Sequence, residues 1–188
     1  VKQLIVINKK TNQLAYYQNG KLVKVFMVGT GRKSSLTPEG KFKIVNKIKN
    51  RPYYKEKIPG GSPKNPLGVR WLGIEARGTY GTTYAIHGNN NPSSIGKYVS
   101  AGCIRMHNDQ VLWLYNKVTV GTPVIITTSD LTLNRIAVKN GYAVTGNIPV
   151  SGPAVSITLR KGMRGSAVKQ LQQKLYARGF NPNGIDGV

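Results

Sequence analysis

Acidic residues are scarce in this sequence. Only 6 of its 188 residues are Asp or Glu, against 28 Lys and Arg, so the formal net charge is +22. The acids are scattered, and no two are close in sequence: Glu39, Glu56, Glu75, Asp109, Asp130 and Asp186. Two-carboxylate glycosidases and carboxylate-rich metal sites need acids that act together. We therefore expect neither chemistry, and we expect no metal and no cofactor.

Cysteine, histidine and long apolar runs are also rare. Cys103 is the only cysteine, which excludes an internal disulfide, and His87 and His107 are the only histidines. No apolar run reaches the roughly 20 residues that a membrane-spanning helix needs, so we expect no membrane span. The chain shows no signal peptide and begins with Val1 instead of Met, so we expect a leader peptide that is absent from this chain.

The excess of positive charge favours a polyanionic partner, which could be nucleic acid, anionic lipid or an acidic cell wall. Charge alone does not choose among them, and a merely solvated basic surface is the simpler alternative. A nucleic-acid binder would interleave aromatic residues with a basic face, and Tyr53, Tyr54 and Tyr80 provide little of that pattern. We therefore expect no nucleic-acid partner.

Residues 1–128 predict a mainly β domain with one or two short helices. Short β-branched or alternating runs predict strands at 2–8, 13–18, 21–28, 41–49, 67–75, 82–86 and 124–128. Asn19-Gly20 predicts a type I′ hairpin turn, and Gly29-Thr30-Gly31 predicts a turn rather than a nucleotide site. A short helical turn is expected at 91–98 and a helix at 110–117. The proline-rich loop 51–66 is long enough to form a wall of a cleft.

The remaining residues predict two further segments. Residues 129–155 have a weaker pattern and indicate a linker, which could include a strand packed on the first domain. Residues 156–188 contain one clear helical pattern, with Val168, Leu171 and Leu175 spaced three and four apart and Gly179 as its stop. We therefore divide the chain at 128 and 155.

Residues 87–108 gather the reactive side chains. Cys103 lies among small residues, and His87 lies upstream at the expected end of a strand. A cysteine nucleophile needs a base and donors for an oxyanion. His87 could take the thiol proton or form a thiolate–imidazolium pair, and His107 is the rival base, or a helix cap or substrate contact. A buried, inert cysteine and a core histidine remain the alternatives that spacing alone leaves open.

Two residues near Cys103 and His87 in the sequence also have candidate roles. No acid lies near His87 in sequence, so the carbonyl of Gly88 is the simplest group to orient its ring. Arg105 would face the same side as Cys103 on an extended segment. Its guanidinium could hold a substrate carboxylate or favour the thiolate, and the alternative is an ordinary surface arginine.

A family resemblance strengthens this interpretation. The hexapeptide SAGCIR at 100–105, preceded by IHG at 86–88, resembles the signature of the L,D-transpeptidase (YkuD-like) catalytic domain. Supporting matches are the paired opening strands, GTG at 29–31, TPEG at 37–40 and GTPV at 121–124, so that the resemblance covers about residues 1–128. Many members have His where this chain has Ala101. We expect this difference to alter substrate contacts more than the core chemistry.

The resemblance implies a β-sandwich-like fold and peptidoglycan cross-linking. It implies that Cys103 is the nucleophile and His87 the base, that the Gly88 carbonyl orients His87, and that the N–H groups of Gly102 and Cys103 form the oxyanion hole. Ser100, Arg105 and His107 would shape the substrate site. The thiolate would attack the third-residue carbonyl of a tetrapeptide stem and release D-Ala. An amine of a neighbouring stem, or water, would resolve the thioester. Carbapenems would acylate the same cysteine.

The C-terminal segment 156–188 resembles the start of the small helical peptidoglycan-binding domain, but it stops at Val188. One helix and a loop cannot bury a core alone, so we expect this segment to dock on the first domain or to be poorly ordered. We expect a monomer outside the membrane, in a Gram-positive cell wall, where anionic wall polymers would attract the +22 charge.

Two alternatives compete with this function. A sortase is also a β-rich wall transpeptidase with Cys, His and Arg, but it would have a Thr-x-Thr-Cys-like segment that is missing here. A non-catalytic wall-binding protein fits the charge and the C-terminal segment, and it predicts that Cys103→Ala changes nothing.

Overall fold

The computed structural model describes residues 2–145. The chain divides into two compact units. Among the described residues, the first unit holds 2–10, 14–26 and 128–145, and the second holds 11–13 and 27–127. The second part of the predicted linker and the predicted C-terminal segment at 156–188 lie outside the described residues. No described helix has the length and apolar character needed to cross a membrane.

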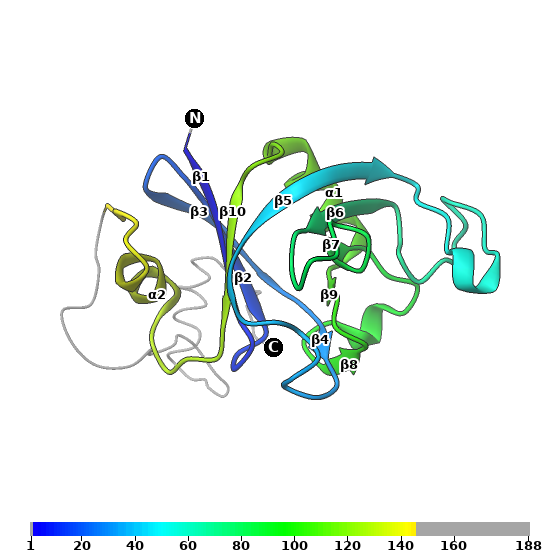
Figure 1. Ribbon diagram of the computed structural model, residues 1–188, viewed down its shortest axis with the longest axis horizontal. Coiled ribbons are helices and arrows are strands. Elements are labelled where there is room, and N and C mark those ends of the chain that lie inside the picture. The colour runs from blue at the N-terminus through cyan, green and yellow to red at the C-terminus, as the bar shows by residue number, and fades with distance from the viewer. Residues whose placement is uncertain (1, 146–188) are drawn as a thin grey trace. The chain divides into compact units, whose positions relative to one another are not determined.

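The first unit contains three strands and a helix. Strands β1 (Gln3–Asn8), β2 (Gln13–Gln18) and β3 (Lys21–Met27) lie in the order β3-β2-β1 (Figure 1). Asn19 and Gly20, between β2 and β3, both have positive φ, at 53° and 81°, as a type I′ turn requires. Nearly all of β1 and β2 is buried, which explains their continuous apolar runs.

Helix α2 (Leu133–Lys139) packs against β1 and occupies part of the predicted linker, where the sequence pattern indicated at most a strand. The Thr132 hydroxyl caps the helix by accepting from the N–H of Arg135 at 3.1 Å, and Ile136 and Ala137 are buried. Its 7 residues are fewer than the roughly 11 over which apolar periodicity can be recognised, so the cap was its main local signal.

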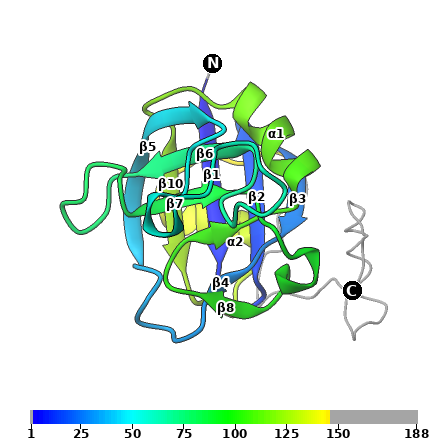
Figure 2. The same ribbon diagram turned by 90° about the vertical axis from the view of Figure 1, so that its right-hand side faces the viewer.

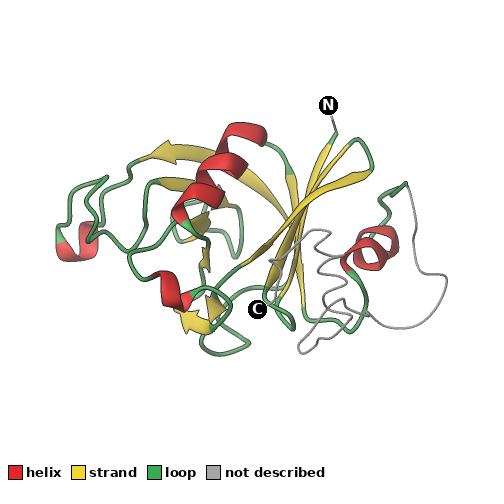
Figure 3. Ribbon diagram, turned by 180° about the vertical axis from the view of Figure 1, so that it is seen from behind, coloured by secondary structure: helices red, strands yellow, loops and turns green. Residues whose placement is uncertain are grey.

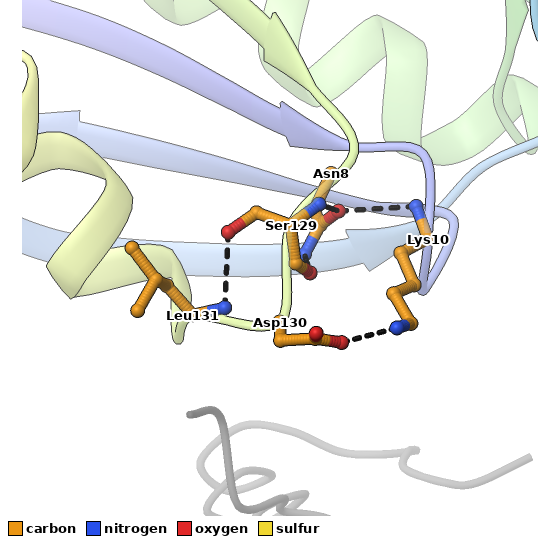
Figure 4. A network of polar contacts seen from close by, with 5 residues as sticks. All are labelled: Asn8, Lys10, Ser129, Asp130 and Leu131. Atoms are coloured by element: carbon orange, nitrogen blue, oxygen red, sulfur yellow. Dashed lines mark hydrogen bonds and ion pairs between the residues drawn. The ribbon is translucent and has the colours of Figure 1, made fainter. Parts of the chain in front are cut away.

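A polar network fixes the chain just before α2 (Figure 4). The Asn8 amide donates to the carbonyl of Ser129 at 2.9 Å and accepts from the Ser129 N–H at 3.1 Å. The Ser129 hydroxyl accepts from the N–H of Leu131, and Lys10 pairs with Asp130. The buried Asn8 therefore anchors residues 129–131 to the end of β1.

The second unit is built on a five-stranded arrangement in the order β10-β5-β6-β7-β9. The strands are β5 (Gly40–Lys49), β6 (Arg70–Ile74), β7 (Tyr84–His87), β9 (Ile104–Arg105) and β10 (Pro123–Thr127). All neighbours are antiparallel except β7 and β9, which are parallel. Helix α1 (Asn108–Lys117) packs against β6 and β7 (Figure 2). The unit also contains two single-turn 3-10 helices, η1 (Tyr54–Glu56) and η2 (Pro92–Ser94).

A second, two-stranded sheet joins β4 (Thr30–Gly31) to β8 (Tyr98–Ser100). Residues 29–31 are therefore extended instead of forming the predicted turn. Gly29 exchanges two backbone hydrogen bonds with Arg105, both 2.8 Å long. A Cβ on Gly29 would lie 2.9 Å from the Ser94 carbonyl oxygen, so this close approach requires glycine.

The mainly β class with short helices, predicted from the sequence, is confirmed (Figure 3). The seven expected strands begin and end within three residues of the expected positions, and α1 begins two residues earlier than expected. The short strands β4, β8 and β9 were not expected. The loop 51–66 contains η1 and a bridge between Tyr53 and Ile58.

Candidate active site

His87 is the last residue of β7 and is 4% exposed. Its Nδ1 lies 2.6 Å from the carbonyl oxygen of Gly88. A carbonyl oxygen only accepts hydrogen bonds, so this contact requires the proton on Nδ1. The lone pair is then on Nε2, which is the tautomer that a general base facing a thiol needs.

The backbone around Gly88 is fixed on several sides. Its N–H donates to the Leu67 carbonyl at 2.9 Å. The Asn108 side chain clamps the next residue, because it accepts from the Asn89 N–H at 3.2 Å and donates to the Asn89 carbonyl at 3.0 Å. A Cβ on Gly88 would lie 2.0 Å from Asn108 Oδ1. The carbonyl that orients His87 is therefore held by residues from two other segments.

Cys103 lies just before β9, which pairs in parallel with β7, the strand that carries His87. Its Sγ donates to the carbonyl of Thr83 at 3.2 Å. The side chain packs against a buried cluster of Leu67, Trp71 and Ala85. Part of Cys103 stays exposed, as do Arg105 and His107, whereas the alternate residues 102, 104 and 106 are buried. This alternation of exposure is that of an extended segment with Cys103 and Arg105 on one face.

The turn before Cys103 is held by two buried hydroxyls. Ser100 Oγ donates to the Cys103 carbonyl at 2.7 Å and accepts from the Gly102 N–H at 3.0 Å. Thr37 Oγ1 donates to the Gly102 carbonyl and accepts from the Gly31 N–H, both at 2.9 Å. Ser100 is 3% exposed, so its hydroxyl is engaged inside the turn rather than facing a cleft.

Gly102 itself has φ of +142°, and a Cβ there would lie 2.7 Å from the Leu36 carbonyl oxygen. Only glycine combines this backbone conformation with that close approach. The TPEG and GTG motifs thus contact the turn before Cys103 through Thr37 and Gly31, a connection that the linear sequence does not show.

The electrostatics favour a neutral thiol beside a neutral imidazole. Burial raises the pKa of the Cys103 thiol to about 11, although the Ala85 N–H and the charges of Arg105 and Arg51 act in the opposite direction. Burial lowers the pKa of His87 to about 4; the bond to Gly88 opposes this shift, and Arg105 and Arg51 add to it. Of the two forms that the sequence left open, the resting protein therefore favours the neutral pair over thiolate–imidazolium.

His107 occupies the position before the first residue of α1. Its carbonyl accepts from the N–H groups of Gln110 and Val111, at 3.0 and 2.9 Å, while its side chain makes no capping bond. His107, the alternative base in the sequence, thus caps α1 through its backbone carbonyl, and its side chain is partly exposed. Ala101 is exposed.

Sequence reasoning missed Trp71, Arg51 and Asn65, which support the site from other elements. The Trp71 and His87 rings stack with centroids 5.8 Å apart. Nothing local marks these residues as functional, because they reach the site only through sheet pairing and loop folding. Residues 2–145 contain no group of three or more His, Cys, Asp or Glu placed to bind a metal. The arrangement suits nucleophilic acyl transfer by a thiol with an oriented imidazole.

Comparisons with known proteins identify the family that the chain resembles. The family model YkuD, described as the L,D-transpeptidase catalytic domain, matches residues 2–126. The chain is 48% identical to the putative L,D-transpeptidase YqjB of Bacillus subtilis, over 72% of this chain and 77% of that protein. It is 42% identical to the putative L,D-transpeptidase YkuD of Bacillus licheniformis, over 65% of this chain and 64% of that protein.

Solved structures share the fold. An L,D-transpeptidase from Mycobacterium smegmatis superposes with a TM-score of 0.50 at 23% identity, covering 66% of this chain and 58% of that one. An L,D-transpeptidase from Mycobacterium tuberculosis H37Rv gives a TM-score of 0.51 at 21% identity, covering 66% and 57%. The chain therefore spans less than two thirds of these structures and of the Bacillus licheniformis relative.

Proposed function

The chain belongs to the L,D-transpeptidase catalytic domain family, and from this premise we propose that it cross-links peptidoglycan stem peptides through a thioester on Cys103. The family consists of acyltransferases, so the chain is an enzyme of that class. The observation that carries the proposed mechanism is the bond from His87 Nδ1 to the Gly88 carbonyl. That bond leaves the lone pair on Nε2, where it can accept the thiol proton. His87 lies on a strand that pairs in parallel with the strand following Cys103.

In the first step, Cys103 Sγ attacks the carbonyl of the third residue of a donor tetrapeptide stem. The thiol proton passes to His87 Nε2 as the S–C bond forms, because neither group is charged in the resting site. The tetrahedral intermediate collapses by breaking the C–N bond to the terminal D-Ala. The imidazolium returns its proton to the departing amine, which leaves a thioester on Cys103 and a neutral His87.

In the second step, the side-chain amine of a neighbouring stem attacks the thioester. His87 takes a proton from this amine and gives it to the departing Cys103 sulfur, which restores both groups and forms a 3→3 cross-link. Water in place of the amine gives L,D-carboxypeptidation. His87 acts as base and then acid in both half-reactions.

The N–H groups of Cys103 and Gly102 are proposed to hold the oxyanion. The Gly102 N–H donates to Ser100 Oγ in the structure, so it would share its hydrogen between Ser100 and the oxyanion, or leave Ser100 as the intermediate forms. Ser100 is then a positioning residue for the turn. Arg105 and His107 lie on the partly exposed face with Cys103, which supports their proposed contact with substrate.

Intact-protein mass after incubation with a carbapenem tests the nucleophile. We expect one covalent adduct on the wild-type protein and none on Cys103→Ala. His87→Gln should retain the thiol but acylate about a hundredfold or more slowly, because general-base catalysis contributes that much. Stem tetrapeptide should then yield D-Ala and cross-linked dimer. An adduct on Cys103→Ala would assign the nucleophile to another residue. No adduct on either protein would count against the proposal and favour the non-catalytic wall-binding alternative.

We also propose that the enzyme acts in the cell wall and is concentrated there by anionic polymers. The support is the formal charge of +22, which such polymers would attract. Sedimentation with purified Gram-positive walls, with and without their anionic polymers, should show binding that weakens as salt rises. Binding that changes neither with salt nor with removal of the polymers would refute anionic wall polymers as the partner. The catalytic proposal would be unaffected.

A further inference from the structure

A column of stacked groups leads from the loop at 51–66 to the His87 ring. The guanidinium carbon of Arg51 lies 4.1 Å from the ring centroid of Trp71 and 5.4 Å from that of Tyr54. Trp71 in turn stacks on His87. Aromatic contacts cover the faces of a guanidinium and leave its in-plane N–H groups available as donors. Arg51 is thus held one aromatic ring away from the proposed base.

Hydrogen bonds also tie the Arg51 backbone to the segment that orients His87. The fully buried Asn65 donates from Nδ2 to the Arg51 carbonyl at 3.0 Å and accepts at Oδ1 from the Leu67 N–H at 2.8 Å. The Leu67 carbonyl accepts from the N–H of Gly88. One side chain therefore links the root of the loop to the Gly88 segment, so that Arg51 is positioned from the same framework as His87.

Among residues 2–145, no carboxylate pairs with the charge of Arg51. Arg51 and Arg105 both perturb Cys103 and His87, which places both cations near the reacting pair. Neither guanidinium is paired with a carboxylate anywhere in residues 2–145. A partly buried arginine with unpaired donors is suited to bind a carboxylate in bidentate fashion.

We propose that Arg51 binds the α-carboxylate of the amino acid that leaves the donor stem. This inference rests on the proposed function, in which a C-terminal D-Ala departs and its carboxylate lies one residue from the bond that breaks. Trp71 acts as the positioning residue that holds the guanidinium beside the reacting pair. Arg105 is the competing cation, but it shares the extended segment with Cys103, whereas Arg51 is contributed by an independent loop.

The test compares two substrates, a stem tetrapeptide with a free C-terminal carboxylate and its C-terminal carboxamide. The wild-type protein should prefer the acid in kcat/KM by about tenfold to a hundredfold, the range of a charge-assisted hydrogen bond. Arg51→Gln should lose most of this preference by slowing on the acid alone. Arg51→Lys should be intermediate, because it keeps the charge but loses the planar fork.

Arg70→Gln is the matched control. Arg70 also stacks on an aromatic ring, that of Tyr115 at 5.2 Å, and its side chain leaves β6 on the face opposite to that of Trp71. It is not among the charges that perturb Cys103 or His87. Its removal changes the net charge equally and should keep the wild-type preference. An Arg51→Gln protein that slows equally on both peptides, or a preference that disappears only in Arg105→Gln, would overturn the assignment.

A binding measurement separates this inference from the proposed function. Calorimetry with the Cys103→Ala protein should show tighter binding of the acid than of the amide, and Cys103→Ala/Arg51→Lys should reduce the difference. Absence of turnover by the wild-type protein would refute the proposed function alone. Equal affinity of Cys103→Ala for the two peptides would refute the role of Arg51, whether or not turnover occurs.

Discussion

The indole of Trp71 lies parallel to the imidazole of His87, with ring planes only 4° apart. The two residues are register partners on β6 and β7, so the sheet itself sets the stack. The indole Nε1 donates to the Gly81 carbonyl at 3.1 Å, which fixes the ring that covers the imidazole. Trp71 therefore helps to hold His87 in one orientation and to keep it out of water.

Replacing Trp71 should separate these contributions. Trp71→Leu should slow carbapenem acylation of Cys103 by about tenfold to a hundredfold, because a displaced base loses alignment with the thiol. Trp71→Phe keeps an aromatic face and should lose less. Both variants lose the bond to Gly81, so the comparison isolates the stack. The measurement is the rate of Cys103 acylation, followed by intact-protein mass. Equal decreases of this rate in the two variants would contradict a role for stacking.

His87 should make stability depend on pH. Its pKa is about 4 in the folded protein, against an ordinary value of about 6.5. The unfolded chain therefore binds the proton first as pH falls. The contribution of neutral His87 to the free energy of unfolding is fully present above about pH 6.5. It decreases by about 3 kcal/mol as the pH falls toward 4. Urea unfolding at several pH values should show that the free energy of unfolding falls further for the wild-type protein than for His87→Gln. An equal dependence on pH in the two proteins would contradict this expectation.

The thiol of Cys103 should be slow to alkylate at neutral pH. Its pKa is raised to about 11 by burial, so the thiolate becomes populated only as pH rises toward that value. The rate of iodoacetamide modification, followed by mass, should keep rising through pH 9, whereas free cysteine begins to level off near its pKa of about 8.5. A plateau of high reactivity near pH 7 would instead reveal a thiolate–imidazolium pair.

Gly88 and Asn108 should be energetically coupled. Alanine at 88 would place its Cβ 2.0 Å from Asn108 Oδ1, and we expect overpacking to cost about 1–3 kcal/mol. Asn108→Ala removes that oxygen, so the double variant should be more stable than the sum of the two single losses predicts. Denaturant unfolding of all four proteins measures the coupling. Strict additivity would mean that the backbone moves away from the clash.

Ser100→Ala distinguishes positioning from substrate contact. The substitution removes two hydrogen bonds inside a buried turn, so we expect it to lower stability by about 1–3 kcal/mol. If the hydroxyl only shapes the turn, kcat for D-Ala release should fall while KM for the stem stays near the wild-type value. A raised KM with unchanged kcat and unchanged stability would restore Ser100 as a substrate contact.

The local pattern of the chain was enough to predict most of the fold. Alternation and turn residues placed the strands, because side-chain period and positive-φ turns such as Asn19-Gly20 are properties of neighbouring residues. Helix α2 escaped prediction because its seven residues show little more than a cap at Thr132. The turn predicted for the GTG segment was wrong because Gly29 contacts the distant backbone of Ser94 and Arg105.

The sequence by itself determined which reactive groups the chain offers for the proposed chemistry. It has one cysteine, a histidine at the end of a strand and an arginine two residues after the cysteine, all within one short stretch. Tertiary structure alone decided their surroundings. Sheet register brings Trp71 to His87, and the folded loop brings Arg51 to Trp71. Burial favours the neutral forms of Cys103 and His87. Stacking, desolvation and charge depend on distances in space, and residues far apart in the chain meet only after folding.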